Sequence, residues 1–403
     1  MMTKTNIPAG YKDSAVGIIP QEWEVATLGK LGKVISGLTY SPDDISDTGI
    51  LVLRSSNIQN GMLCMADNVY VNTVSYNPVK TGDILICVRN GSKNLIGKSA
   101  YITPHYEGSA FGAFMSIYRS ANNNYLKHLF NSDIFYKNVH RNLGATINFI
   151  NGNDLKKFVI PVPPMEEQRK IAEILGVWDE AIEKQSRLIE KLELRKRALM
   201  QRLLTGRTRL PGFTTPWQKV KLGEIFKERN ETKCEHLPLL SITADRGVIL
   251  QSESDKKDTS NDDKSKYKRI CPNDIGYNTM RMWQGRSALS AMEGIVSPAY
   301  TIVTPKVEVD PLLISELIKQ PRVVYDFWTH SQGLVGDTLN CKFHDFSQVK
   351  VAIPSLPEQK VIAEVLTTAD DEIATHRKKL DALRLQKRGL MQQLLTGKTR
   401  VKI

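Results

Sequence analysis

Two Cys–His pairs have the spacing of metal ligands. Cys234 is followed by His236, and Cys341 is followed by His344. A tetrahedral zinc site needs four ligands, and neither pair has a second pair nearby in the sequence. The five cysteines are scattered along the chain and form no C-x-x-C motif. We therefore predict that the protein has no metal site.

A second candidate for chemistry is the segment from Gly91 to Ser99, which resembles a phosphate-binding loop. The pattern G-x-x-x-x-G-K-[ST] needs glycine at position 92, where this chain has serine, and no helical pattern follows. The sequence also lacks the glycine-rich dinucleotide loop, G-x-S-x-G, H-E-x-x-H and the Asn/Asp-Pro-Pro-Tyr/Phe loop of amino-group DNA methyltransferases. We therefore predict a binding protein without a catalytic site. The alternative is a divergent DNA methyltransferase or nuclease with unrecognised motifs.

The charge of the chain points to a polyanionic partner. Lys and Arg number 55 against 43 Asp and Glu, which gives a net charge of +12. Basic residues are concentrated between Arg195 and Arg209 and between Arg377 and Lys402. A solvated helix face near a helix C-terminus would explain these runs equally well. No apolar run is long enough to cross a bilayer, and the N-terminus lacks a signal-peptide pattern, so we predict a cytoplasmic protein without a membrane partner.

An internal repeat defines the elements that must position any binding residues. The segment Glu167–Arg209 matches Glu358–Arg400 at a constant offset of 191 residues, with 21 identities in 43 positions. The chain is therefore a tandem duplication. The regions that precede the two segments also correspond, for example Trp23 to Gly29 with Trp217 to Gly223.

Both repeated segments show the apolar pattern of a helix that packs along one partner helix. Apolar residues recur in steps of four and three, interrupted at Gln185 and Lys196 in the first copy and at His376 and Lys387 in the second. A helix with a single apolar stripe is not stable alone, so we predict that the two copies pack as an antiparallel pair. The predicted seam residues are Ile171, Leu175, Trp178, Ile182, Ile189, Leu192, Leu199 and Leu203, with Ile362, Leu366, Ala369, Ile373, Leu380, Leu383, Leu390 and Leu394.

The predicted fold class is α+β, with two pseudo-repeated globular α/β domains joined by two long antiparallel helices that form a coiled coil. The predicted boundaries are 1–163 for the first domain with its N-terminal arm, 164–206 for the first helix, 207–354 for the second domain and 355–403 for the second helix. Short β-like runs occur at Ile84–Val88, Met115–Tyr118 and Ala299–Val303. The loops of the two domains differ almost completely, which favours two different ligands or two parts of one asymmetric ligand.

This arrangement resembles the specificity subunit of type I restriction-modification systems. The resemblance covers essentially the whole chain. It rests on Ile19-Pro20-Gln21-Glu22-Trp23, Gly82-Asp83-Ile84-Leu85, Ile160 to Pro164 before Glu167-Gln168, and Leu203-Leu204-Thr205-Gly206, with Ile353-Pro354, Glu358-Gln359 and Leu394 to Gly397 in the second copy. One departure is the charged stretch Ser252–Arg269, which has no counterpart in the first domain.

The resemblance implies a non-catalytic subunit with two target recognition domains. Each domain would read one half of a bipartite asymmetric site in double-stranded DNA, and the helices would set the spacing between the halves. The helices would also dock two methyltransferase subunits, and restriction/translocase subunits would join them. S-adenosylmethionine, ATP and Mg would be bound by those partners, and this chain would bind no cofactor.

Residues that could read bases lie on loops with hydrogen-bonding side chains. Arg can bridge O6 and N7 of guanine, Asn or Gln can pair with adenine, and Trp can stack on a base. The candidates in the first domain are Arg54, Asn57, Arg89, Asn90, Lys93, Lys98 and the loop from Gly144 to Asn148. Those in the second are Arg281, Trp283, Gln284 and Arg286. Phosphate contacts are predicted for Lys156, Lys157, Arg207 and Arg209.

Overall fold

The structure is a computed structural model that describes residues 7–65, 67–73, 75–143, 148–243, 246–254, 258, 260–333 and 339–402. The chain forms two compact units, Met1–Ser186 with Lys378–Ile403 (unit 1) and Arg187–Arg377 (unit 2). Each unit thus contains one globular domain, residues 7–163 (domain 1) or 207–354 (domain 2), and part of both long helices. Within the described residues, no helix is long and apolar enough to cross a membrane.

Domain 1 is an α+β domain with two four-stranded sheets. The strand order is β11-β10-β13-β4 in one sheet and β12-β6-β9-β5 in the other. The strands are β1 Tyr11–Lys12, β2 Ile19–Pro20, β3 Glu24–Thr27, β4 Lys33–Ser36, β5 Ile45–Ser46, β6 Ile50–Leu53, β7 Ile58–Gln59, β8 Met62–Leu63, β9 Val69–Val71, β10 Ile84–Cys87, β11 Ser99–Tyr101, β12 Ala110–Phe111, β13 Met115–Arg119 and β14 Val159–Val162. The helices are α1 Leu28–Leu31, α2 Asn123–Leu129, α3 Asp133–Asn142 and α4 Gly152–Lys156.

Domain 2 repeats the sheet β11-β10-β13-β4 of domain 1, with the strand order β21-β20-β23-β16. We call this sheet the principal sheet of each domain. Its strands are β15 Gln218–Lys221, β16 Phe226–Glu228, β17 Leu240–Ile242, β18 Val248–Leu250, β19 Lys268–Ile270, β20 Ile275–Asn278, β21 Ser287–Leu289, β22 Gly294–Val296, β23 Tyr300–Pro305 and β24 Lys350–Ile353. Its helices are α6 Leu222–Ile225, α7 Pro311–Leu317, α8 Pro321–His330 and α9 Phe343–Gln348. The sheets β12-β6-β9-β5 of domain 1 and β17-β18 of domain 2 differ, whereas the principal sheet and the two-stranded sheets β3-β14 and β15-β24 are duplicated.

A buried aspartate lies directly before strand β10 in domain 1 and directly before strand β20 in domain 2. Asp83 and Asp274 are 2% and 1% exposed, and each accepts a hydrogen bond from the backbone N–H three residues earlier. Asp83 binds the Arg119 guanidinium through two hydrogen bonds of 2.7 and 2.6 Å. Asp274 binds Arg229 at 2.7 and 3.3 Å. The aspartate therefore occupies the same place in both copies, whereas its arginine comes from β13 in one and from the end of β16 in the other.

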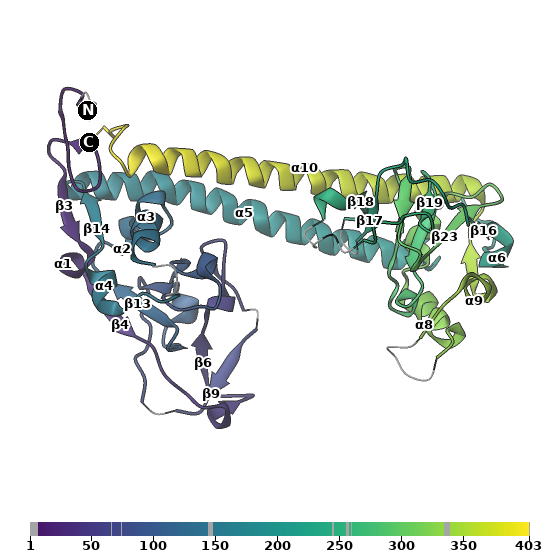
Figure 1. Cartoon of the computed structure of the whole chain (residues 1–403), viewed down its shortest axis with the longest axis horizontal. Helices are drawn as coiled ribbons and strands as arrows, with labels where there is room; N and C mark the ends of the chain where they lie inside the picture. The colour runs from purple at the N-terminus through teal and green to yellow at the C-terminus, as the bar shows by residue number, and fades with distance from the viewer. Residues whose placement is uncertain are drawn as a thin grey trace. The chain divides into compact units, whose positions relative to one another are not determined.

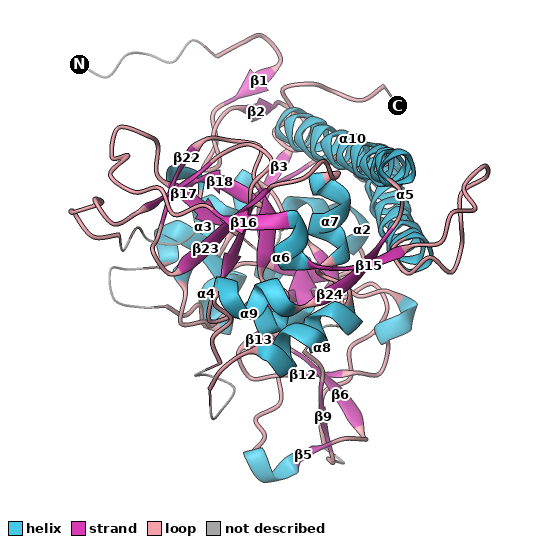
Figure 2. Ribbon diagram, turned by 90° about the vertical axis from the view of Figure 1, so that its right-hand side faces the viewer, coloured by secondary structure: helices cyan, strands magenta, loops and turns pink. Residues whose placement is uncertain are grey.

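The two repeated segments are the long helices α5 (Met165–Leu203) and α10 (Leu356–Leu394), each of 39 residues. The prediction of two long helices is therefore confirmed. In each unit a part of α5 lies beside a part of α10 (Figures 1 and 2). In unit 1 Lys387 forms an ion pair with Asp179, and in unit 2 Lys196 forms an ion pair with Asp370 at 2.6 Å. Each residue of the first pair lies 191 positions from its equivalent in the second, so both units have the same antiparallel register.

The predicted seam residues lie along the contact between the helices. Ten of the fifteen apolar residues other than Ala369 are buried: Ile171, Leu175, Ile189, Leu192, Leu203, Ile362, Leu366, Ile373, Leu380 and Leu394. Ala369 is also buried. Trp178, Ile182, Leu199, Leu383 and Leu390 are partly buried. The antiparallel coiled-coil pairing predicted from the apolar repeat is therefore present within each unit.

A buried glutamate at the start of each long helix forms an ion pair with an arginine in the segment that follows the other long helix. In unit 1 Glu167 is fully buried, accepts a hydrogen bond of 2.8 Å from Trp23 Nε1 and pairs with Arg400 at 2.7 Å. In unit 2 the equivalent Glu358 is fully buried and pairs with Arg209 at 2.7 Å. The guanidinium of Arg209 forms a two-pronged ion pair with Glu358, so it has a structural role that the sequence did not predict, and its phosphate contact stays a prediction.

Candidate nucleic-acid interface

In domain 1, three of the predicted DNA-reading residues meet at the turn formed by Ser55–Asn57. Lys98 Nζ donates to the backbone carbonyl of Ser55 at 3.3 Å, and Asn90 Nδ2 donates to the Ser55 hydroxyl at 3.3 Å. Arg54 precedes this turn and pairs with Asp67 at 2.7 Å. These side chains are partly buried, so the turn holds them in fixed positions while leaving polar atoms at the surface.

Asn57 does not belong to a DNA-facing surface, and its prediction as a base reader is wrong. Its side chain is fully buried. Its Oδ1 accepts a hydrogen bond of 2.9 Å from the backbone N–H of Arg54, and its Nδ2 donates to the carbonyl of Cys64 and to Asn68. Asn57 therefore stabilises the turn that positions Asn90 and Lys98.

The remaining candidates of domain 1 lie close in the fold to the loop after β10. Arg89 and Lys93 are exposed, and the Arg89 guanidinium lies over the Phe114 ring, 5.0 Å from its centroid. Asn148 Nδ2 donates to the carbonyl of Gly91 at 3.2 Å. The other residues of the predicted loop, 144–147, lie outside the described residues. Arg89 and Lys93 therefore lie on the loop after β10, and Asn148 contacts that loop through Gly91, a contact that the sequence did not predict.

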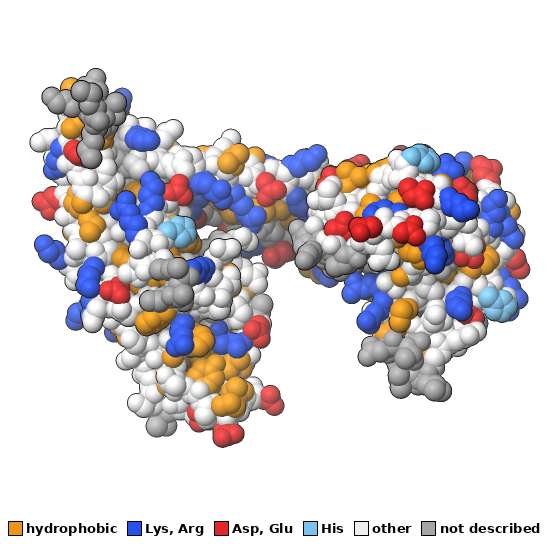
Figure 3. Space-filling model, viewed as in Figure 1, with side chains coloured by type: hydrophobic (Ala, Val, Ile, Leu, Met, Phe, Trp, Pro, Cys, Tyr) orange, Lys and Arg blue, Asp and Glu red, His pale blue; other side chains and the backbone are white. Residues whose placement is uncertain are grey.

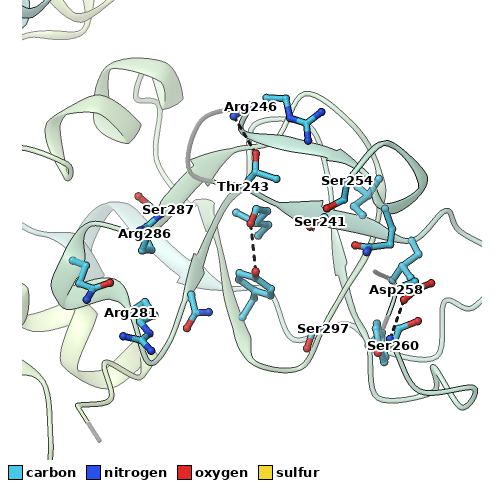
Figure 4. A pocket seen from close by; sticks show the side chains of 18 of the residues that line it. Ser241, Thr243, Arg246, Ser254, Asp258, Ser260, Arg281, Arg286, Ser287 and Ser297 are labelled. Carbon is cyan, nitrogen blue, oxygen red and sulfur yellow. Dashed lines mark hydrogen bonds between the residues drawn. The ribbon is translucent and has the colours of Figure 1, made fainter. Parts of the chain in front are cut away.

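In domain 2, three of the four predicted readers line an open hollow of about 920 Å³. Arg281, Gln284 and Arg286 belong to the segment between β20 and β21, and all three are exposed. Figure 4 shows Arg281 and Arg286 on one side of the hollow and Ser254, Asp258 and Ser260 on the other. Trp283 does not line the hollow, because its indole N–H donates to the carbonyl of Met280 at 3.0 Å and its ring is half-buried.

Among its described lining residues, the hollow has more cations than carboxylates. Its described lining includes four cations, Arg246, Arg281, Arg286 and Lys319, and one carboxylate, Asp258. The Arg246 guanidinium donates to the carbonyl of Glu253, and Lys319 pairs with Glu316 at 2.9 Å. Polar groups from Asn278, Ser241 and Thr243 complete the wall. A concave surface with surplus cations and many hydrogen-bonding groups is suited to the edge and backbone of a nucleic acid.

Sequence reasoning missed Arg246 and Lys319, which lie far from the segment after β20. It also left open the role of the charged stretch Ser252–Arg269. That stretch contributes Ser254, Asp258, Ser260 and Tyr267 to the hollow. The only available signal was its absence from the first domain, since an insertion into a common framework changes the surface of one copy only.

The predicted phosphate-binding residues other than Arg209 are exposed. Lys156, Lys157 and Arg207 all lie at the surface, and Lys157 pairs with Asp154 at 3.1 Å. On the face drawn in Figure 3, Lys and Arg side chains are distributed over both units instead of gathering in one stripe. The net charge therefore reflects many dispersed cations as well as those of the hollow.

Two of the five cysteines, Cys87 and Cys341, are buried. Among the residues that the structure describes, no group of three or more His, Cys, Asp and Glu has the geometry of a metal site. Burial raises the pKa of the Cys87 thiol to about 11 and that of Cys341 to about 12. Both thiols are therefore protonated at neutral pH and pack as small apolar groups.

Comparison with known proteins identifies the family. The model of the type I restriction modification DNA specificity domain matches residues 20–194 and 317–385. The putative type I restriction enzyme MjaX specificity subunit of Methanocaldococcus jannaschii is 27% identical, with 97% of each chain aligned. The type I restriction enzyme EcoKI specificity subunit of Escherichia coli is 28% identical over 54% of this chain and 49% of its own length.

Two solved structures share the fold. One, described under complex assembly and conformational transition of the type I R-M system, has a TM-score of 0.56 and 18% identity over 94% of this chain and 99% of that chain. The type I restriction-modification S subunit from M. genitalium has a TM-score of 0.52 and 16% identity over 93% of this chain and 96% of that chain. Since the family model matches more than half of the sequence, the chain belongs to the type I restriction-modification DNA specificity family and is a sequence-specificity subunit.

Proposed function

We propose that each domain of this specificity subunit reads one half of a bipartite, asymmetric site in double-stranded DNA. The observation that carries this proposal is the contrast between a common framework and different surfaces. Both domains have the same principal sheet and the same buried aspartate. Domain 1 presents Asn90 and Lys98 beside the Ser55 turn and Arg89 over the Phe114 ring, whereas domain 2 presents Arg281 and Arg286 in a cationic hollow. Two different surfaces on the same framework are suited to binding two different half-sites.

The helix pair is proposed to set the distance between the half-sites and to dock two methyltransferase subunits. The equivalent ion pairs Asp179–Lys387 and Asp370–Lys196 give the pair a local twofold pattern in its sequence and contacts. Such a pattern suits two copies of one partner, because each copy meets an equivalent surface. Restriction/translocase subunits are proposed to join the same complex.

The chemistry is proposed to belong to these partners. S-adenosylmethionine, ATP and Mg would be bound by them, and this chain would be a non-catalytic reader. Adenine methylation also requires the base to leave the stack, which the methyltransferase would carry out. Equilibrium dialysis of the isolated chain against labelled S-adenosylmethionine is expected to show no binding. Saturable binding would favour the alternative of a divergent methyltransferase.

Two experiments test this proposal, one in cells and one with the chain reconstituted with its methyltransferase subunit. Genome-wide mapping of methylated adenines in cells with and without this chain should reveal a two-part site whose methylation requires it. In filter binding, Arg281→Ala and Arg286→Ala should each weaken binding to the cognate site by about 1–3 kcal/mol if they contact bases. Arg322→Ala, which removes an exposed cation of domain 2 outside the hollow lining, is the matched control. Equal losses on cognate and random DNA would contradict base reading by Arg281 and Arg286.

A further inference from the structure

The end of strand β10 in domain 1 carries an exposed group of two aromatic rings and one arginine. Phe114 is 54% exposed and Phe149 is 43% exposed. The Arg89 guanidinium lies 5.0 Å from the centroid of the Phe114 ring. Arg89 and Phe149 form an antiparallel β-bridge, so their side chains lie on the same face. We call Arg89, Phe114 and Phe149 the β10 corner.

The backbone of this corner is held firmly, although its rings are not needed for packing. The Phe114 carbonyl accepts hydrogen bonds from the N–H groups of Val88 and Arg89 at 3.0 and 3.1 Å. The N–H of Ile150 donates to the carbonyl of Val88 at 2.9 Å. Neither ring belongs to a buried core cluster of domain 1. A rigid backbone that displays two large apolar rings to solvent indicates a contact with another molecule.

Domain 2 has the same corner with different side chains. The N–H of Thr279 donates to the carbonyl of Ala299 at 3.2 Å, and the N–H of Cys341 donates to the carbonyl of Thr279 at 2.9 Å. These bonds match those of domain 1 and place Met280, Ala299 and Asn340 where domain 1 has Arg89, Phe114 and Phe149. In domain 2 these residues line a hollow of about 690 Å³. The β10 corner of domain 1 therefore exposes two rings and a cation, whereas the equivalent residues of domain 2 line a hollow.

We propose that the β10 corner contacts base edges in the half-site read by domain 1. The Phe114 and Phe149 rings contact thymine methyl groups, and the guanidinium of Arg89 donates to guanine. This proposal rests on the proposed function of the chain as a DNA reader. It adds Phe114 and Phe149 as residues that determine specificity and gives Arg89 a defined base preference.

The chemistry of the corner favours bases over phosphates. Phenylalanine contacts the thymine methyl group in the major groove and has no favourable interaction with a phosphate. The face of the Phe114 ring attracts the guanidinium of Arg89 and restricts its position. A restricted arginine loses less conformational entropy when it forms a bidentate contact with guanine. The neighbouring Asn90 and Lys98 are held by the Ser55 turn, so the corner extends an already ordered polar surface.

The framework comparison supports the same assignment. A residue that only shields a core would be retained in kind between two copies of one framework. At the β10 corner two of the three backbone hydrogen bonds are retained, since the N–H of Met280 donates to Asn278 Oδ1 instead of the Ala299 carbonyl. All three side chains differ in size, charge or polarity. This is the pattern that two readers of different half-sites require. A contact with a protein partner is the competing explanation, and the experiment must separate the two.

The test uses the reconstituted complex and a randomised duplex library whose bound members are sequenced. Phe114→Ala and Phe149→Ala are compared with Met165→Ala, which removes an apolar side chain of similar exposure (48%) at the start of α5. We expect both Phe variants to relax the preference for thymine at one or two positions of one half-site and to leave the other half-site unchanged. Affinity for the cognate duplex should fall by about ten-fold, of the order found when one base pair of a specific duplex site is mismatched.

Replacement of the contacted thymine by deoxyuridine gives an independent readout. Loss of the methyl group should weaken binding of the wild-type complex and of the Met165→Ala complex, and it should have no effect on the variant that lacks the Phe ring contacting that thymine. Arg89→Lys should relax guanine at an adjacent position, because lysine cannot form the bidentate contact.

Three results would overturn the proposal. The Phe variants could select the wild-type sequences with wild-type affinity, they could lose affinity equally for all sequences, or they could fail to retain the methyltransferase subunit. The last result would assign the corner to a protein interface. If the wild-type complex itself selects no sequence, the proposed function of the chain fails, which is a distinguishable outcome.

Discussion

The first prediction concerns the loss of stability when the buried Asp274 carboxylate of domain 2 loses its ion-pair partner Arg229. The Asp274 carboxylate is 1% exposed and accepts three hydrogen bonds, two from Arg229 and one from the backbone N–H of Cys271. The same carboxylate raises the pKa of the Arg229 guanidinium, so the arginine remains a cation throughout the useful pH range. Arg229→Met keeps the apolar stem and removes the charge, which leaves the carboxylate with a single hydrogen-bond donor.

The expected loss follows from the burial of the two groups. Removal of one partner of a fully buried ion pair costs about 3–5 kcal/mol. The Arg229 side chain is 19% exposed, so water can replace part of it, and we expect a loss of about 2–4 kcal/mol. For a unit of roughly 190 residues, about 3 kcal/mol lowers Tm by roughly 6–12 °C. Thermal unfolding followed by circular dichroism on the full chain would measure this change.

Two further variants make the reasoning falsifiable. Lys227→Met removes an exposed cation from the same strand and should leave Tm within about 2 °C of the wild type. Asp274→Asn combined with Arg229→Met removes both charges, and it should be more stable than Arg229→Met alone because no buried charge remains unpaired. A Tm for Arg229→Met within about 2 °C of the wild type would refute the argument.

Three other predictions concern different parts of the molecule. Burial, with Lys387 and Lys127 nearby, lowers the pKa of His128 well below its usual value despite Asp179 at 3.6 Å. Below about pH 6.5 the unfolded state therefore binds more protons than the folded state, and the free energy of unfolding falls by up to about 1.4 kcal/mol per pH unit. Urea unfolding at pH 5 and pH 7 should show a smaller difference for His128→Gln than for the wild type. Asn57→Ala should destabilise the chain by about 1–3 kcal/mol in the same assay without changing the DNA sequences selected, since buried hydrogen bonds are lost. Leu192→Asp should lower Tm strongly because the residue is 7% exposed in the seam, whereas Leu194→Asp, at 57% exposure, is the control; equal effects would contradict the assigned helix face.

The long helices could be predicted well because their signals are local and repeated. The apolar stripe placed helices at 164–206 and 355–403, and α5 and α10 begin within one residue of those starts. They end at Leu203 and Leu394, so the predicted end of the second helix was wrong by nine residues. The seam followed from the same pattern. The strands predicted at Ile84–Val88 and Met115–Tyr118 correspond to β10 and β13 within one residue. Order and spacing along the chain contain this information directly.

The candidate site was less predictable because its side chains acquire their roles from distant parts of the chain. Arg209 belongs to a basic run, but its environment is set by Glu358, 149 residues away. Asn57 has the side chain of a base reader, yet it caps a turn and is buried. The exposed rings of Phe114 and Phe149 look like core residues in a sequence, and only the fold shows that they lie at the surface. Residue type alone does not distinguish these cases.

The shared aspartate has a consequence for exchanging segments between the two domains. The strand register places Thr304 where domain 1 has Arg119, and Ile35 where domain 2 has Arg229. A hybrid domain that takes β13 or β23 from the wrong copy would therefore leave the carboxylate without its cation, or would give it two. Recombination between the halves therefore preserves this buried ion pair only when the strand that carries the arginine and the strand paired with it are exchanged together. The shortest exchangeable module is thus larger than a single loop, even where the backbones coincide.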